Sequence, residues 1–201
     1  MCKEMQCNMT KNTIIITALR LFLLRGYKNV SLVDVAKEMG ITKGGIYHYF
    51  GSKEDLFQVG ICYLFGQFET KYVEALGTEK SVRETLRFLL GGELEFYIEG
   101  LLNIKQGDYR ANNASLALEI MHNFPNIQEE IDRSQLEVRD TIAKKMQRAQ
   151  ETGEIRKDLD AQHLATLVLA TSSGLNVLGR NLNTPLMRQQ IIDSVWRLIG
   201  A

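Results

Sequence analysis

One segment constrains the fold of this chain more than any other: residues 31–57, which read SLVDVAKEMGITKGGIYHYFGSKEDLF. Ser31 is a favourable N-cap, and apolar residues then recur at the i, i+3, i+4, i+7 spacing of one helix face. These apolar positions are Leu32, Val35, Ala36 and Met39. Gly40 ends this short helix, and Thr42 can cap a second one. The spacing therefore predicts two short helices joined by a glycine turn, which is the arrangement of a helix-turn-helix.

The second helix of this segment has an apolar side and a basic, aromatic side. Ile46 and Phe50 point inward at i, i+4. The side chains on the other faces are Lys43, Tyr47, His48 and Tyr49. A helix that enters the major groove must be held by a preceding helix across a tight turn, with its N-terminal residues towards the DNA. Gly44 lets the backbone approach a phosphate, and Lys53 follows the next N-cap, Ser52. The segment therefore predicts a DNA-binding element.

These residues resemble a known family. The DNA-binding domain of TetR-type transcriptional regulators is similar to TKGGIYHYFGSKEDLF together with the preceding RGYKNVSLVDVAKEMG. The similarity covers about a quarter of the chain, roughly Thr10 to Phe57. It implies that Ile46 and Phe50 are core residues. It also implies that phosphate or base contacts come from Ser31, at the start of the supporting helix, and from Thr42, Lys43, Gly44, Tyr47, His48, Tyr49 and Lys53.

The second helix departs from the family pattern at one position. Gly45 follows Gly44, where such helices commonly carry a larger residue, and each helical glycine costs roughly 0.5–1 kcal/mol relative to alanine. The helix also lacks Arg, Asn and Gln, the side chains best suited to bidentate base reading. Direct readout is therefore left to Lys43 and the aromatic side chains, and the operator sequence does not follow from the residues.

The rest of the chain reads as helices. The chain has only two prolines, Pro125 and Pro185, and no sustained alternating strand pattern occurs. We therefore expect an all-α protein. We expect a three-helix helix-turn-helix head, residues 1–57 and ordered from about residue 10, that binds DNA. The resemblance implies that the remaining helical bundle, residues 58–201, binds an effector and dimerises. Residues 1–60 hold eight Lys or Arg against five Asp or Glu, a net charge of +3 that suits DNA, whereas the whole chain is neutral.

Apolar periodicity and capping signals place the individual helices. Ser81 with Glu84 forms a capping-box signature, Asp160 can cap a later helix, and Pro125 and Pro185 can each occupy a first turn. The helix after Ser81 is expected to pass through a glycine pair, which would mark a bend. The expected helices outside the helix-turn-helix cover residues 10–26, 53–76, 81–102, 111–123, 125–151, 160–178 and 185–198.

The last two of these helices are apolar over wide faces. In the family, the corresponding helices pair with their copies in a four-helix dimer interface, so the resemblance implies a homodimer. The expected interface residues are Leu164, Leu167, Val168, Thr171, Leu175, Leu178, Met187, Ile191, Val195 and Leu198. An alternative is that residues 164–178 only fill the core of one subunit. A two-fold dimer would place two heads one DNA turn apart, roughly 34–36 Å, on a palindromic operator.

The resemblance also implies an effector pocket between the middle helices. Its candidate wall residues are Phe65, Phe68, Phe88, Phe96, Tyr97, Met121, His122 and Phe124, and further polar anchors are Glu95, Asn113 and Asn123. Aromatic residues at helical spacing equally fit a plain core. A bound small molecule would tilt the helix that begins at Lys53 and so change the spacing of two heads. The resemblance implies a repressor, released by its effector, in preference to an activator.

Two other classes of function compete with this one. The first is a DNA-binding regulator without a small-molecule ligand, controlled by a protein partner. The second is a helical enzyme, whose acids would be Glu93, Glu95 and Glu99 and whose bases would be His122 or His163. No nucleophile or phosphate loop stands at a supporting spacing, so we expect no enzyme.

The cysteines and the hydropathy pattern bound the compartment. Cys2, Cys7 and Cys62 form neither a CxxC pair nor a Cys/His cluster, so no metal or other cofactor is expected. No export signal and no apolar run long enough for a membrane helix occur, so we expect a cytoplasmic protein without a membrane partner. The expected partners are double-stranded DNA, a second copy of the chain and a small-molecule effector.

Overall fold

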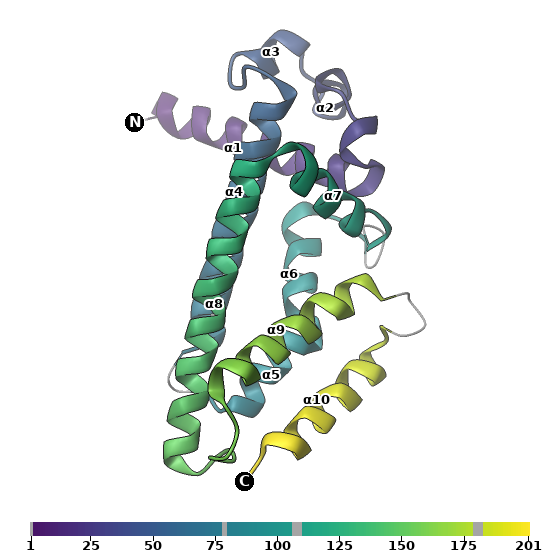
Figure 1. Cartoon of the computed structure of the whole chain (residues 1–201). Helices are drawn as coiled ribbons and strands as arrows, with labels where there is room; N and C mark the ends of the chain where they lie inside the picture. The colour runs from purple at the N-terminus through teal and green to yellow at the C-terminus, as the bar shows by residue number, and fades with distance from the viewer. Residues whose placement is uncertain (1, 78–79, 106–109, 179–182) are drawn as a thin grey trace. The chain divides into compact units, whose positions relative to one another are not determined.

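The computed structural model describes residues 2–77, 80–105, 110–178 and 183–201 (Figure 1). Throughout these ranges the regular structure is helical and contains no β-strand, so the all-α prediction is confirmed. The helices are α1 (Cys2–Arg25), η1 (Tyr27–Asn29), α2 (Leu32–Glu38), α3 (Lys43–Tyr47), α4 (Lys53–Ala75), α5 (Val82–Gly91), α6 (Glu93–Leu102), α7 (Arg110–Asn123), α8 (Pro125–Thr152), α9 (Ala161–Val177) and α10 (Pro185–Ile199).

Most helix ends lie where the capping signals predict them. Ser81 and Glu84 form a complete capping box at the start of α5, and the Asp160 carboxylate accepts a hydrogen bond from the His163 N–H at the start of α9. Pro125 and Pro185 each begin a helix, as predicted. These signals act over three or four residues, so a short window of sequence contains all of the information that they need.

Two helix boundaries differ from the sequence-based expectation. The first helix begins at Cys2 instead of near Thr10, and no glycine or proline lies between these residues to stop it. The expected helix that ends at Leu102 is two helices, because Gly92 adopts the left-handed conformation with φ of 96° and closes α5. The glycine pair therefore separates two helices instead of bending one.

Chain contacts divide the protein into two compact units, each with its own core. The head unit contains the residues up to Gln67 and Ile98–Gln128, and the bundle unit contains Phe68–Tyr97 and Glu129–Ala201. Three helices, α4, α6 and α8, pass from one unit into the other. The functional boundary expected after residue 57 stays a prediction.

The core of the head unit holds the short helices in place. Val35 and Ala36 of α2 are buried, and so are Ile46 and Phe50, which confirms the predicted inward faces. The same core includes apolar residues of α1 and α4: Ile14, Ile15, Ala18, Leu19, Phe22, Leu56, Phe57 and Ile61. Burial of these side chains supplies most of the free energy that keeps a five-residue helix such as α3 folded.

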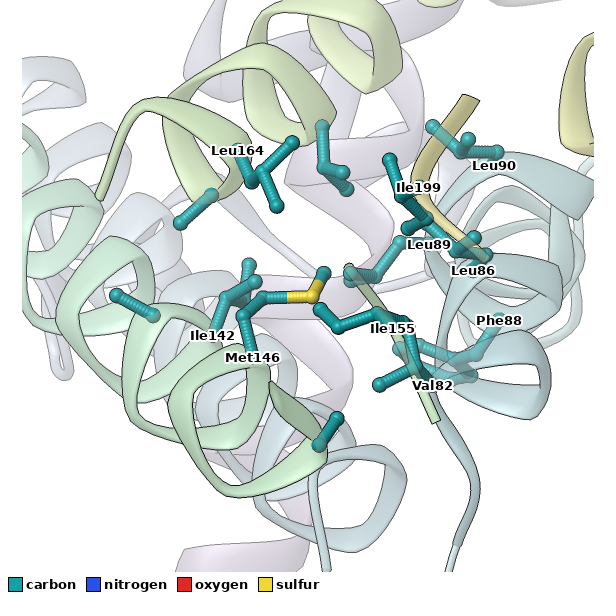
Figure 2. Close-up of a cluster of buried hydrophobic side chains, with 14 of the residues drawn as sticks. Val82, Leu86, Phe88, Leu89, Leu90, Ile142, Met146, Ile155, Leu164 and Ile199 are labelled. Carbon is teal, nitrogen blue, oxygen red and sulfur yellow. The ribbon is translucent and has the colours of Figure 1, made fainter. Parts of the chain in front are cut away.

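The core of the bundle unit is formed by α5 and by the helices that pack on it (Figure 2). Helix α5 lies against both α9 and α10. The labelled side chains of this cluster are Val82, Leu86, Phe88, Leu89, Leu90, Ile142, Met146, Ile155, Leu164 and Ile199. In the part of the chain that the structure describes, no helix is both long enough and apolar enough to cross a bilayer.

Candidate DNA-binding interface

Helix α2 is fixed at its start by a capping box. The Ser31 hydroxyl accepts a hydrogen bond from the Asp34 N–H at 3.2 Å and donates one to Asp34 Oδ2 at 2.6 Å. The Ser31 N–H donates to the same carboxylate oxygen at 2.8 Å. These bonds from Ser31 lower the pKa of Asp34. Ser31 is exposed, so it lies at the surface of the head as the predicted DNA contact requires, but its hydroxyl already serves the helix.

The turn between α2 and α3 is a Schellman motif. Gly40 has φ of 67°, the Gly40 N–H donates to Lys37 O at 3.2 Å, and the Ile41 N–H donates to Ala36 O at 3.0 Å. A side chain other than glycine would be strained at this φ. Gly40 therefore sets the angle at which the chain leaves α2 and enters the next helix.

Helix α3 has the position and exposure of a recognition helix. The Thr42 hydroxyl accepts a hydrogen bond from the Gly45 N–H at 3.2 Å, and Ile46, fully buried, anchors the helix in the core. The first amides of any helix lack an acceptor within the helix. Gly44 is exposed and has no side chain to cover the amides of this turn. The start of α3 can therefore approach a phosphate closely.

The remaining predicted contacts of α3 occur as two side-chain pairs. The Lys43 ammonium lies 5.2 Å from the centre of the Tyr47 ring, and both residues are exposed. The His48 and Tyr49 rings meet edge to face with centroids 5.0 Å apart, with His48 exposed and Tyr49 half-buried. Stacking restricts these side chains without removing them from solvent. Three of the four are thus presented on the outer surface of α3.

Lys53 occupies a different environment from the other predicted contacts. Its ammonium lies 4.1 Å from the centre of the Tyr27 ring, and burial lowers its pKa. The Tyr27 hydroxyl donates to the Glu54 carboxylate at 3.3 Å, and burial raises the pKa of that phenol. Lys53 therefore packs on the core of the head while its charge lies next to the start of α4.

An aromatic cluster stands behind this surface. The Tyr27 ring lies 4.5 Å from Phe57 and 5.5 Å from Phe124, and Phe57 lies 4.8 Å from Phe124. Phe22 completes the cluster, 5.4 Å from Tyr27. Phe124, predicted as an effector contact, thus packs inside the head unit. Sequence reasoning missed Tyr27, whose only local signal is an aromatic residue directly after the helix-ending Gly26.

The other predicted effector residues are spread over both units. Phe65, Met121 and His122 belong to the head unit, whereas Phe68, Phe88, Phe96 and Tyr97 belong to the bundle unit. Phe88 is a core residue that packs against Tyr72, and Tyr97 lies under the Lys71 ammonium at 5.0 Å. Phe96 is 66% exposed and Met121 52% exposed. The side chain of Asn113 lies outside the described residues.

The cavity that the structure describes in the bundle unit is lined by other residues. Its volume is about 490 Å³. Its walls are Leu76, Lys80, Ser81, Val82, Thr141, Lys144, Lys145, Arg148, Ala149, Thr152 and Glu154. None of the predicted effector residues belongs to this set. The Lys145 ammonium donates to the carbonyls of Gly77 and Lys80, so part of the positive charge already holds the chain between α4 and α5.

The predicted dimer residues divide into a buried set and an exposed set. Leu164, Val168 and Leu175 belong to the core of the bundle unit. Thr171, Met187, Ile191 and Val195 are half-buried, and the exposed residues are Leu167, Leu178 and Leu198. Leu186 and Val177, which were not predicted, are each 69% exposed. Helices α9 and α10 therefore bury one apolar face inside the unit and expose a second apolar surface.

Two candidate residues of the competing enzyme, Glu95 and His163, have structural partners. Glu95 forms an ion pair with Arg188, and Glu99 is buried. His163 lies beside Asp160 at the start of α9 and is exposed. Among the described residues, no group of three or more His, Cys, Asp or Glu side chains has the arrangement of a metal site.

Family models match both parts of the chain. The model for "Bacterial regulatory proteins, tetR family" matches residues 14–59, and the model for "Tetracyclin repressor-like, C-terminal domain" matches residues 113–195. Together they cover more than half of the chain. The first match contains the capped helix pair, the Schellman turn and the start of α4.

Individual relatives are also regulators. YerO of Bacillus subtilis, an uncharacterized HTH-type transcriptional regulator, is 33% identical over 90 residues, which are 44% of this chain and only 31% of YerO. UidR of Escherichia coli is 24% identical over 168 residues, 83% of this chain and 79% of UidR. The solved structure of a transcriptional regulator from Saccharomonospora viridis, in complex with choline, is 29% identical with a TM-score of 0.79, covering 96% of this chain and 99% of that one. These relatives are transcriptional regulators and not enzymes, and the chain belongs to the TetR family of DNA-binding transcriptional regulators.

Proposed function

We propose that this regulator is a homodimeric repressor that binds a palindromic operator and is released when a small molecule binds to its helical domain. The observation that carries the DNA-binding part is the exposed surface of α3, held by the Thr42 cap and the buried Ile46. A recognition helix must present polar side chains outward while its opposite face stays packed. Helix α3 meets both conditions within five residues.

The proposed contacts follow from the exposure of each residue. Lys43 and Tyr47 face outward at the start and end of α3 and are assigned to base edges or to the phosphates beside them. Thr42 and Gly44 are assigned to a phosphate at the start of the helix. The other assigned contacts, to the DNA backbone, are Ser31, His48, Tyr49 and Lys53. Lys53 must leave the Tyr27 ring to make a direct contact.

The proposed dimer interface rests on the exposed apolar residues of the last two helices. Leu167 is 51% exposed on α9, and Leu198 is 64% exposed on α10. Surfaces of this kind on consecutive helices favour helix pairing with a second copy. The buried residues of α9 pack it onto α5 and so hold the proposed interface in place; these residues are Leu164, Val168 and Leu175. The small residues of α9 contribute to that internal contact, because the Ser172 hydroxyl donates to Leu89 O at 2.9 Å.

The proposed effector is supported by a similar protein. One similar structure was solved in complex with choline, which supports a small-molecule ligand for this chain as well. The alternative is a regulator of the same fold that responds to a protein partner. The test is a binding screen that begins with choline, followed by operator affinity with and without the bound molecule. Release requires a change in affinity of about 5-fold to 150-fold, and a bound molecule that leaves affinity unchanged contradicts the switch.

The DNA contacts are tested with a duplex selected from a randomised library. We expect an enriched palindrome bound by protein dimers, and no enrichment contradicts the proposal. Lys43→Ala should weaken binding and relax the sequence preference, whereas Lys53→Ala should weaken all sequences equally and lower the salt slope by about one unit. Lys144→Ala is the matched control, because this exposed lysine lies in the bundle unit. If Lys43→Ala binds like Lys144→Ala, the assignment of Lys43 is wrong.

A further inference from the structure

A buried arginine connects the last helix to the junction between α5 and α6. Arg188 of α10 is 5% exposed, and its guanidinium makes three hydrogen bonds. Nε donates to Asn183 Oδ1 at 2.6 Å, and one terminal nitrogen donates to Leu90 O at 2.9 Å. The other terminal nitrogen donates to a carboxylate oxygen of Glu95. One side chain thereby contacts the end of α5, the first turn of α6 and the segment that precedes α10.

Two of the partners of Arg188 lie at helix ends. Leu90 O belongs to the last turn of α5, where carbonyls lack a donor within the helix. Glu95 lies in the first turn of α6, where a carboxylate is favourable. The Asn183 amide donates in turn to Leu175 O of α9 at 2.5 Å. The network thus joins four helices of the bundle unit around one ion pair.

Gly92 lies directly against this guanidinium. A Cβ built at Gly92 would lie 3.4 Å from the Arg188 Cζ, and Gly92 has a positive φ of 96°. The residue that separates α5 from α6 is therefore packed directly against the arginine. Because the guanidinium is a planar fork with fixed donor directions, it holds its partners in one relative arrangement. A lysine ammonium at the same position cannot reach all three acceptors in that arrangement.

The apolar packing around the network is less specific. Helices α5 and α10 also meet through Leu86 and Ile199 of the core cluster. Apolar contacts have little directional preference, so they allow two helices to slide or rotate with little change in buried area. Buried hydrogen-bonded charges penalise such shifts, because a displaced partner loses its bond while it stays away from water.

Helix α6 begins in the bundle unit and ends in the head unit. Its residues Glu93–Tyr97 belong to the bundle unit, and Ile98–Leu102 belong to the head unit. An α-helix is continuously hydrogen-bonded, so the direction fixed at its first turn is maintained along ten residues. Glu95 lies in that first turn, so the Arg188 network holds the end of α6 that belongs to the bundle unit.

We propose that Arg188 is a positioning residue for operator binding: it fixes the start of α6 relative to the proposed dimer helix α10, and so fixes the spacing of the two heads in the dimer. This inference rests on the proposed dimeric function. Arg188 contacts no DNA and no dimer partner in this role. It acts through Glu95 and Leu90, and its effect appears only when both heads must bind one duplex together.

The test compares two duplexes and two arginine variants. The duplexes are the selected palindrome and the same duplex with one half-site scrambled. Arg188→Lys should lower affinity for the palindrome about tenfold, within the range typical of coupling between sites. It should leave affinity for the half-site and the sedimentation of the dimer unchanged, because the head unit and the exposed faces of α9 and α10 are intact. Arg83→Lys is the matched control, since the Arg83–Asp193 pair also joins α5 to α10 but its side chains are about 40% exposed, far more than Arg188.

The other possible outcomes contradict the positioning role, call for a second variant or contradict the proposed function. If Arg188→Lys binds the palindrome like Arg83→Lys, or loses palindrome and half-site affinity equally, the positioning role is wrong. If Arg188→Lys does not fold, Glu95→Gln replaces it, because glutamine keeps an acceptor for the arginine but removes the charge. That variant should show a smaller loss confined to the palindrome, and unchanged affinity overturns the proposal. If the wild-type protein selects no palindrome or is a monomer, the proposed function fails, independently of Arg188.

Discussion

The polar contacts that cap α2 and α3 in the head unit differ from those around Arg188 in the bundle unit in the distance along the chain that they span. In the head unit, the side-chain caps join residues three apart, as in Ser31 with Asp34 and Thr42 with Gly45, whereas the contacts of Tyr27 with Glu54 and of Lys28 with Glu119 are long-range there as well. In the bundle unit, Arg188 pairs with Glu95, 93 residues away, and the Val82 N–H donates to Glu154, 72 residues away.

This difference suits the two tasks. A recognition surface made from local caps and turns can be presented by a short segment, provided that a core holds it in place. A domain that holds two heads at a fixed spacing needs contacts between distant segments, since only these determine how helices are arranged relative to one another. Substitutions at the long-range contacts of the head unit test whether the head depends only on local contacts.

The largest effect is expected where the head unit makes its own long-range contact. Phe57 is fully buried and packs on Phe124, which lies at the corner between α7 and α8. Truncation of a buried phenylalanine leaves a cavity and costs about 3–5 kcal/mol. We expect Phe57→Ala and Phe124→Ala each to lower the free energy of unfolding in urea by this amount, which would show that the head needs α7 and α8.

The control for these two variants is Phe96→Ala. Phe96 is 66% exposed, so its truncation should change the free energy of unfolding by less than about 0.5 kcal/mol. If Phe124→Ala behaves like Phe96→Ala, the segment up to Phe57 is stable without the α7–α8 corner, and the head is more local than the structure indicates.

The sequence predicts the features that depend on neighbouring residues. Ser31, Thr42, Ser81 and Asp160 cap helices as expected, because each needs only an amide three positions along the chain. The inward faces of α2 and α3 follow from helical periodicity for the same reason. The start of α10 at Pro185 was predicted as well, although its N-cap, Thr184, was not.

The sequence does not predict the features that depend on tertiary contact. Glu95 was considered as a pocket anchor or an enzymatic acid, but its arginine partner lies on the last helix. Gly92 ends α5, and the packing of Arg188 against it is visible only in three dimensions. Phe88 and Phe124 have the spacing of pocket residues, yet one is core of the bundle unit and the other packs on Tyr27. Periodicity identifies an apolar face but not what covers it.

A smaller effect is expected in the recognition helix, where two glycines allow a matched pair of variants. A Cβ at Gly44 or Gly45 would make only ordinary contacts, at 3.8 Å and 3.6 Å respectively. Alanine should therefore stabilise α3 at either position by about 0.5–1 kcal/mol. Gly45→Ala should keep its DNA affinity, whereas Gly44→Ala should lose affinity because a methyl group holds the backbone away from the phosphate.

The measurement is binding of the selected duplex by fluorescence anisotropy, alongside urea unfolding of each variant. Equal affinity of the two alanine variants would remove Gly44 from the proposed phosphate contacts. A loss of stability in either variant would show that α3 is not a regular helix at these glycines.

The smallest effect concerns the capping box, which occurs in both units. Asp34 in the head unit and Glu84 in the bundle unit each complete a capping box, and bonds from the capping serine lower the pKa of each below its ordinary value of 3.8 or 4.5. A carboxylate whose pKa is lower in the folded state binds fewer protons there than in the unfolded state. Its stabilising contribution is therefore present above the unfolded pKa and is lost as pH falls through the folded pKa.

This pH dependence can be isolated with neutral variants. We expect Asp34→Asn and Glu84→Gln to be less stable than the wild type at about pH 6. The difference should shrink as pH falls below the ordinary pKa values of 3.8 and 4.5, and should vanish only below the lowered pKa of each folded carboxylate. Urea unfolding across this range measures it. A difference that does not change with pH would mean that the carboxylate charge contributes nothing to the cap. If the two variants behave equally, the capping boxes of the two units work in the same way. The two units then differ in their long-range contacts.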